Sequence, residues 1–129
     1  MIEAAVVLGP DRRPLHWHEP VGASATGLPD SRGLWDVLWE HRAELVGVAH
    51  THPGGGEPVP STEDVTTFAA CEAALGRRLE WWIATADQVR CFRHAGPGRT
   101  DYAAENAEMD ETRTAPWLDE LRARSGRWT

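Results

Sequence analysis

Residues 45–64 read LVGVAHTHPGGGEPVPSTED and combine two structural patterns around one loop. The first part, residues 45–52, is a compact run of Leu, Val, Gly and Ala that ends in histidines, which is typical of a buried interior strand. Ser61 is a residue type favoured at helix N-termini, and the sequence after it predicts a helix that continues to residue 75. The stretch therefore predicts a strand, a glycine-rich loop and a helix.

The two histidines of this stretch are one residue apart. Because side chains alternate between the two faces of a strand, His50 and His52 should project from the same face at the strand end. Asp64 falls in the first turn of the expected helix, where the helix dipole favours a carboxylate. Two imidazoles and one carboxylate leave a fourth tetrahedral position open, as in catalytic zinc sites. The sequence predicts one zinc ion per chain at His50, His52 and Asp64.

The same residues also allow a purely structural interpretation. Ser61 and Asp64 have nearly the spacing of a capping box, in which both residues only satisfy backbone donors at the start of a helix. An HxH pair alone is weak evidence for a metal. The combination of HxHP, a glycine-rich loop and PSxxD favours the metal site.

The rest of the chain extends the strand and helix pattern on both sides. Further strands are expected at residues 2–8, 15–21, 79–85 and 89–94, and further helices are expected to begin at Asp30 or Ser31 and at Pro116. These elements predict one α/β domain with a mixed β-sheet flanked by helices. We divide it into a domain over residues 1–98 and an acidic, helical appendage over residues 99–129. Residues 101–111 are expected to form a solvated helix face or a loose linker.

Other aromatic residues and histidines are expected to be structural. Four tryptophans are predicted in the core: Trp35, Trp39, Trp81 and Trp82. For Trp117 and Trp128, packing on the domain and packing on a partner are both left open. A second HxH pair, His16 and His18, is expected on an exposed hairpin face because no serine or carboxylate follows at a useful distance.

Composition excludes several classes of function. The formal net charge of −7 argues against a nucleic-acid partner, because phosphate binding requires many basic side chains. The two cysteines, Cys71 and Cys91, lie in segments expected to be buried and do not form a disulfide framework, which fits a reducing cytoplasm. Neither a membrane-spanning run nor a signal-peptide pattern is expected.

The pattern HTHP at residues 50–53, followed by PSTED at residues 60–64, resembles the JAMM motif of the JAB/MPN zinc metalloproteases. These are isopeptidases that release ubiquitin and ubiquitin-like proteins from their conjugates. The resemblance covers roughly residues 2–94, and bacterial members, including the related RadC domain, look especially similar. It implies the cytidine deaminase-like MPN/JAB fold, with zinc on the two histidines and the aspartate and with Ser61 holding the oxyanion. The loop at residues 53–60 is one residue longer than is usual in the family, a length that its extra glycine can accommodate.

The resemblance also implies a glutamate upstream that acts as the general base. Glu3 is our candidate, because the run from Glu3 to Gly9 is similar to the family strand E-x-x-G-x-L-x-G with one residue missing. Glu19 is the rival, although Pro20 follows it directly.

The expected reaction is hydrolysis of a peptide or isopeptide bond after the C-terminal tail of a ubiquitin-like or sulfur-carrier protein, in the cytoplasm. Two alternatives stay open: a non-catalytic MPN scaffold that mediates protein assembly, and a RadC-like domain near DNA, which the negative charge disfavours. A homodimer is also left open.

Overall fold

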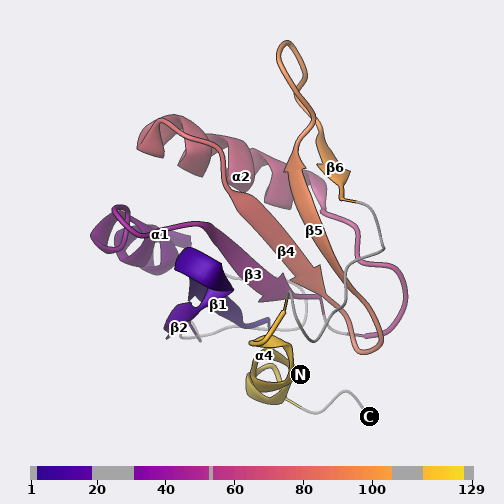
Figure 1. Ribbon diagram of the computed structural model, residues 1–129. Helices are drawn as coiled ribbons and strands as arrows, with labels where there is room; N and C mark the ends of the chain where they lie inside the picture. The colour runs from indigo at the N-terminus through magenta and orange to yellow at the C-terminus, as the bar shows by residue number, and fades with distance from the viewer. Residues whose placement is uncertain (1–2, 19–30, 53, 106–114, 127–129) are drawn as a thin grey trace.

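The computed structural model of the 129-residue chain describes residues 3–18, 31–52, 54–105 and 115–126. Within these residues, six strands form one mixed sheet in the order β2-β1-β3-β4-β5-β6 (Figure 1). The strands are β1 (Ala5–Leu8), β2 (Pro14–His18), β3 (Gly47–Thr51), β4 (Glu80–Ala84), β5 (Val89–His94) and β6 (Tyr102–Ala104). The helices are α1 (Ser31–Glu40), α2 (Thr62–Leu75) and α4 (Leu118–Arg124), with a short 3-10 helix, η1 (Pro10–Arg12). The predicted α/β class with a mixed sheet is confirmed.

Strand β3 lies inside the sheet, antiparallel to β1 and parallel to β4. All of its residues are buried, as predicted for an interior strand. A parallel pair needs a crossover connection, and α2 provides it between β3 and β4. Gly47 allows the two strands to approach, because a Cβ at this position would lie 2.3 Å from the carbonyl oxygen of Glu80. The glycine-rich loop therefore leads from the end of β3 to the start of the crossover helix.

The sheet has a hydrophobic layer on each face. On one face, Val48 and Trp81 belong to a cluster that also contains buried residues of α1 and α2. On the other face, Ala49 and Trp82 pack in a cluster with Leu121 of α4. Figure 1 shows α4 on the opposite side of the sheet from α1 and α2. Successive residues of β3 and β4 thus contribute alternately to the two layers.

A buried carboxylate, Glu72, connects α2 to two strands. It accepts hydrogen bonds from the Leu79 backbone N–H at 2.8 Å, from Trp81 Nε1 at 3.1 Å and from the Tyr102 hydroxyl. Arg78 Nη1 lies 3.0 Å from Glu72 Oε1 and completes an ion pair. The hydrogen bonds to Glu72 help fix α2 against β4 and β6.

The prediction for Trp39 is wrong. Three of the four tryptophans predicted in the core are buried or partly buried: Trp35, Trp81 and Trp82. Trp39 is 47% exposed, and the Arg42 guanidinium lies 4.2 Å from the centre of its ring. An amphipathic helix buries only one stripe, and in α1 the buried stripe contains Leu34 and Leu38.

The prediction of an exposed histidine face on the first hairpin is also wrong. Strand β2 pairs with β1 as expected, but His18 is buried and His16 is partly buried. The two rings lie 5.9 Å apart, and the ring of His41, just after α1, lies 6.5 Å from that of His16. The segment at the end of α1 therefore helps to cover this face.

The segment after residue 98 contributes to the sheet and to its second layer. Tyr102–Ala104 form β6 beside β5, so a solvated helix or linker is the wrong expectation for these residues. Trp117 is buried in the layer beneath α4, whereas Trp128 and residues 106–111 lie outside the described residues. The predicted division at residue 98 stays a prediction. Among the described residues, no helix has the length and apolar character needed to cross a membrane.

We expect Glu72→Ala to lower the free energy of unfolding by at least about 2 kcal/mol, because it leaves buried donors of β4 and β6 without an acceptor. Urea denaturation in the presence of a chelator measures the effect without a contribution from metal. Glu44→Ala, at an exposed position, is the control. Equal stability of the two variants would contradict the role assigned to Glu72.

Candidate metal centre

His50, His52 and Asp64 converge at the carboxyl end of β3. The Nε2 atoms of His50 and His52 lie 3.1 Å apart, and His52 Nε2 lies 3.0 Å from Asp64 Oδ2. His50 Nε2 lies 3.5 Å from Asp64 Oδ1. The two histidines come from alternate positions at the end of one strand, and the aspartate comes from the first turn of α2. The structure thus brings together the three residues predicted as metal ligands.

The spacing of these three groups fits a metal ion such as zinc. Tetrahedral bonds of about 2.0–2.1 Å place neighbouring ligand atoms about 3.3 Å apart. The three atom pairs above, at 3.0–3.5 Å, span this value. Within the described parts of the chain, this is the one group of three or more metal-binding side chains with atoms close enough to share an ion. The donor set and its spacing therefore fit the predicted cofactor.

Asp64 is held by a capping box as well as by the histidines. Its backbone N–H donates to Ser61 Oγ at 3.0 Å, and the Ser61 backbone N–H donates to Asp64 Oδ2 at 2.9 Å. The structural interpretation of Ser61 and Asp64 is therefore correct, and it is compatible with the metal site. The cap fixes the carboxylate while Oδ1 and Oδ2 still face the imidazoles.

The charges of the site favour an ionised Asp64. Burial alone would raise its pKa, but hydrogen bonds from His50 and His52 hold the pKa of Asp64 well below its usual value of 3.8. Burial alone would lower the pKa of His52, but the hydrogen bond to Asp64 and the negative charges of Asp64 and Glu3 raise it above 6.5. The carboxylate is thus available as a ligand across the physiological pH range.

Aromatic packing supports His50 from the side of the core. The Phe68 ring on α2 lies edge-to-face with the His50 ring, with centroids 6.1 Å apart. Phe68 also stacks on Trp81, which donates to Glu72. The orientation of the His50 imidazole is therefore coupled to the packing of α2 on β4.

Glu3 lies on the same side of the sheet as the three candidate ligands. Ala5 pairs with His50 in the register of β1 and β3, and Glu3 precedes Ala5 by two residues, so the alternation of side chains places Glu3 on the same face as His50. Glu3 is half-buried, and burial raises the pKa of its carboxyl group while the charges of His50 and His52 oppose the rise. The rival, Glu19, lies outside the described residues. Glu3 is therefore near enough to the site to interact electrostatically with both histidines.

Thr51 was not identified from the sequence, although it fixes the position of Glu3. The Ala4 backbone N–H donates to Thr51 Oγ1 at 3.0 Å, and the Thr51 N–H donates to the Ala4 carbonyl at the same distance. Thr51 is fully buried on the face away from the histidines. A Thr between two histidines gives no signal of this contact until the neighbouring strand is known.

Ser61 lies at the rim of the site and is exposed. Its Oγ accepts the Asp64 N–H, which leaves the hydroxyl hydrogen available for donation to another group. The predicted role of Ser61 toward an oxyanion stays a prediction, and this arrangement is compatible with it.

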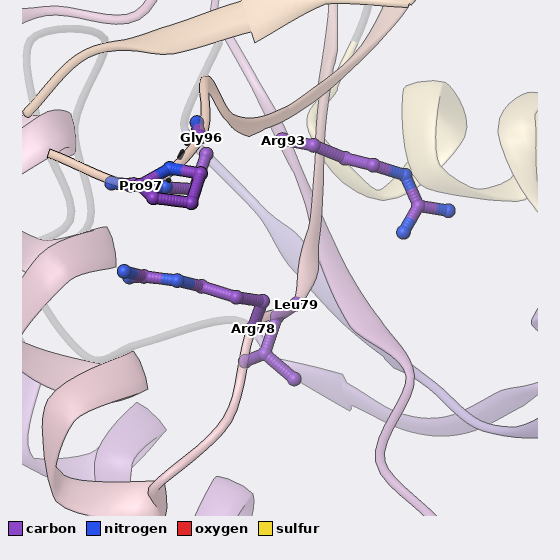
Figure 2. A pocket seen from close by; sticks show the side chains of 6 residues that line it. Arg78, Leu79, Arg93, Gly96 and Pro97 are labelled. Carbon is purple, nitrogen blue, oxygen red and sulfur yellow. Dashed lines mark hydrogen bonds between the residues drawn. The ribbon is translucent and has the colours of Figure 1, made fainter. Parts of the chain in front are cut away.

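A separate hollow of about 510 Å³ lies at the opposite end of the sheet (Figure 2). It is lined by Arg78, Leu79, Arg93, His94, Gly96 and Pro97. Figure 2 shows the side chains of Arg78 and Arg93 extending in opposite directions, so their charges do not converge on one point. The lining contains none of the candidate ligands.

Comparison with known families agrees with this geometry. Residues 3–95 match the family described as prokaryotic homologs of the JAB domain. The chain belongs to this family, and its sheet and helices form an α/β JAB fold. A search of curated proteins found no match. The family, together with a histidine and aspartate group able to hold a metal, supports the role of a metal-dependent hydrolase.

We expect the stability of the metal-free protein to depend on pH through the pair His52 and Asp64. Because the pKa of His52 is higher in the folded state than in the unfolded state, protonated His52 stabilises the fold. This contribution to the free energy of unfolding is full below the unfolded-state pKa of 6.5 and is lost as the pH rises through the folded-state pKa. The lowered pKa of Asp64 gives stability that is present above 3.8 and is lost as the pH falls. Urea denaturation with a chelator should give the largest difference between wild type and Asp64→Asn between about pH 4 and pH 6.5.

The Asp64→Asn substitution keeps a side-chain oxygen that can accept the Ser61 N–H, so the comparison isolates the charge of the carboxylate. The difference should shrink as the pH rises through the raised folded-state pKa of His52, where the imidazole loses its proton. A difference that is constant from about pH 5 to pH 9 would contradict a charged pair.

Proposed function

We propose that this protein is a zinc-dependent hydrolase that cleaves a peptide or isopeptide bond after the C-terminal tail of a ubiquitin-like or sulfur-carrier protein. The observation that carries the proposal is the convergence of His50, His52 and Asp64, with their donor atoms 3.0–3.5 Å apart and with the half-buried Glu3 close enough to interact with the charges of both histidines. Membership of the prokaryotic JAB family supports the class of reaction. We assign the activity to the cytoplasm and to one zinc ion per chain.

Each side chain of the site would have a separate role in such a reaction. His50, His52 and Asp64 would hold the zinc ion, and the chemistry it would supply is to make water a usable nucleophile near neutral pH. Glu3 would accept the proton of that water and return it to the leaving amine, a role worth about 10² to 10⁴ in rate. Its half-buried position raises its pKa, which makes it a better base than an exposed carboxylate. Ser61 would donate its free hydroxyl hydrogen to the oxygen of the attacked carbonyl.

The proposed substrate is a slim, extended peptide tail. The site lies at the end of β3, next to a loop with three consecutive glycines, and residues 55–57 and Ser61 are exposed. An extended tail ending in glycines can reach such a site without displacing packed side chains. The tail of a ubiquitin-like or sulfur-carrier protein has this form.

Two other functions are less well supported. A non-catalytic scaffold does not need three converging ligands, and this chain has them. A RadC-like role near DNA is disfavoured by the net charge of −7. A hydrolase therefore explains the convergence of His50, His52 and Asp64 better than either alternative does.

Protein purified without added metal should contain about one equivalent of zinc by elemental analysis. His50→Ala and Asp64→Ala should lose most of this zinc, because each removes a ligand. His16→Ala is the matched control, since His16 belongs to the other HxH pair. Unchanged zinc content in His50→Ala would show that the site is misassigned.

Incubation with fusions in which a C-terminal extension follows a ubiquitin-like tail should give cleavage at the end of the tail. Chelation and Asp64→Ala should abolish cleavage. Glu3→Gln should retain zinc and fold but lose about 10²-fold or more in rate, because an amide cannot accept the proton. Full activity in Glu3→Gln together with an inactive Glu19→Gln would move the base to Glu19.

A zinc-loaded protein that cleaves no such fusion, including fusions of ubiquitin-like proteins from its own genome, would favour the scaffold. Retention of zinc in Glu3→Gln separates a catalytic defect from a loss of metal.

A further inference from the structure

The glycine-rich loop before α2 is attached to the turn between β4 and β5. We define the glycine loop as residues 54–57 and the β4–β5 turn as residues 85–88. The Gly56 N–H donates to Asp87 Oδ1 at 2.8 Å, and Thr85 Oγ1 donates to the Gly56 carbonyl at 2.7 Å. The Ala86 N–H donates to the Gly54 carbonyl at 2.8 Å. Figure 1 shows this loop passing beside the turn on its way from β3 to α2.

These contacts hold a backbone that is otherwise unrestrained by side chains. Gly54 and Gly56 have φ angles of 105° and 100°, which L-residues with a side chain rarely adopt. A Cβ at either position would meet no atom within 4 Å, so no neighbouring group packs closely against these two glycines. An exposed pair between Arg90 and Glu57 adds little, as surface pairs generally do. The hydrogen bonds to the β4–β5 turn therefore set the path of the glycine loop.

The β4–β5 turn is itself held by the C-terminal helix. Arg122 on α4 donates from Nε to the Thr85 carbonyl at 2.9 Å and from Nη2 to the Gln88 carbonyl at 3.2 Å. One guanidinium thus bridges both ends of the turn. Leu121, beside it, is fully buried in the second layer, which fixes the helix against the sheet. Arg122 lies beyond residues 3–95, the part of the chain that matches the family.

We propose that Asp87 and Arg122 are positioning residues for the candidate metal centre. Arg122 holds the β4–β5 turn, Asp87 in that turn holds the glycine loop, and the loop sets how the N-terminus of α2 meets the end of β3. His52 precedes the glycine loop in the chain, and Ser61 and Asp64 follow it. A shift of the loop would therefore move His52 relative to Ser61 and Asp64. The consequence for catalysis rests on the proposed function.

The charge of Arg122 also acts on Asp87 directly. The Gly56 N–H is the largest cause of the lowered pKa of Asp87, and the Arg122 guanidinium contributes in the same direction. The hydrogen bond from the loop amide thus favours the ionised form of this carboxylate. Arg122 on α4 thus affects the loop mainly through its hydrogen bonds to the turn backbone, and its positive charge also favours the ionised form of Asp87.

The test compares Asp87→Ala and Arg122→Ala with conservative and control variants in the full chain. Asp87→Asn keeps an oxygen that accepts the Gly56 N–H, and Arg122→Lys keeps a donor for one carbonyl but not for both. Arg124→Ala is the control, because Arg124 is on the same helix but pairs with Glu120 and lies over Trp17. Hydrogen exchange measured by mass spectrometry reports on residues 54–57, and release of zinc to a chelator reports on the site.

We expect Asp87→Ala and Arg122→Ala to exchange about five- to ten-fold faster over residues 54–57, with wild-type exchange in β3 and β4. Zinc release should also be faster than in wild type. Asp87→Asn and Arg122→Lys should restore at least half of the protection, and Arg124→Ala should leave the loop unchanged. In the cleavage assay, kcat/KM should fall about ten-fold or more at full zinc occupancy.

Exchange over residues 54–57 that is unchanged in both alanine variants overturns the proposal. So does a uniform increase over the whole chain, or an equal increase in Arg124→Ala, since either outcome reflects only general destabilisation. Exchange and zinc release do not need a substrate. If no fusion is cleaved but the loop responds, the proposed function fails and the positioning role stands; if fusions are cleaved but the loop does not respond, the reverse holds.

Discussion

The parallel pairing of β3 with β4 is the constraint on which the candidate site depends. Two parallel neighbours cannot be joined by a tight turn, so the chain must leave the end of β3, cross the sheet as α2 and return to the start of β4. This path begins α2 beside the end of β3. His50, His52 and Asp64 meet because a strand ends and a crossover helix begins at the same edge. In α/β sheets, the carboxyl ends of strands are the usual place for ligands for the same reason.

Much of this arrangement could be predicted from local sequence signals. The buried strand, the Ser61 cap, the end of α2 at Gly76 and the pairing of β4 with β5 follow from patterns a few residues long. The convergence of the two histidines with Asp64 could be predicted too, because strand alternation and a short loop leave few other arrangements. The likeness to the JAMM motif added the expected roles of these residues, and the family match agrees with that likeness.

Contacts between segments distant in the sequence could not be predicted. Trp39 fits the helical pattern of Leu34 and Leu38 within one helix, and only the position of the sheet decides which side is exposed. The burial of His18, on the edge strand β2, depends on tertiary packing that no local pattern specifies. Thr51, Asp87 and Arg122 act through partners 31 to 47 positions away in the chain. Thr51 is the unspecified position of the HxHP pattern, and Asp87 and Arg122 belong to no recognised motif, so their roles emerge only from the fold.

The capping box at the start of α2 has a consequence for the uptake of metal. Ser61 and Asp64 satisfy each other's backbone N–H groups, so the rotamer of the Asp64 carboxylate is already fixed by helix formation. A ligand that is ordered before the ion arrives loses little conformational entropy on binding, whereas a free side chain of this kind would have to be immobilised. The free energy of ion binding is then reduced less by the entropic cost of ordering the ligand side chain. Binding of an ion at the candidate site would then need little rearrangement of the N-terminus of α2.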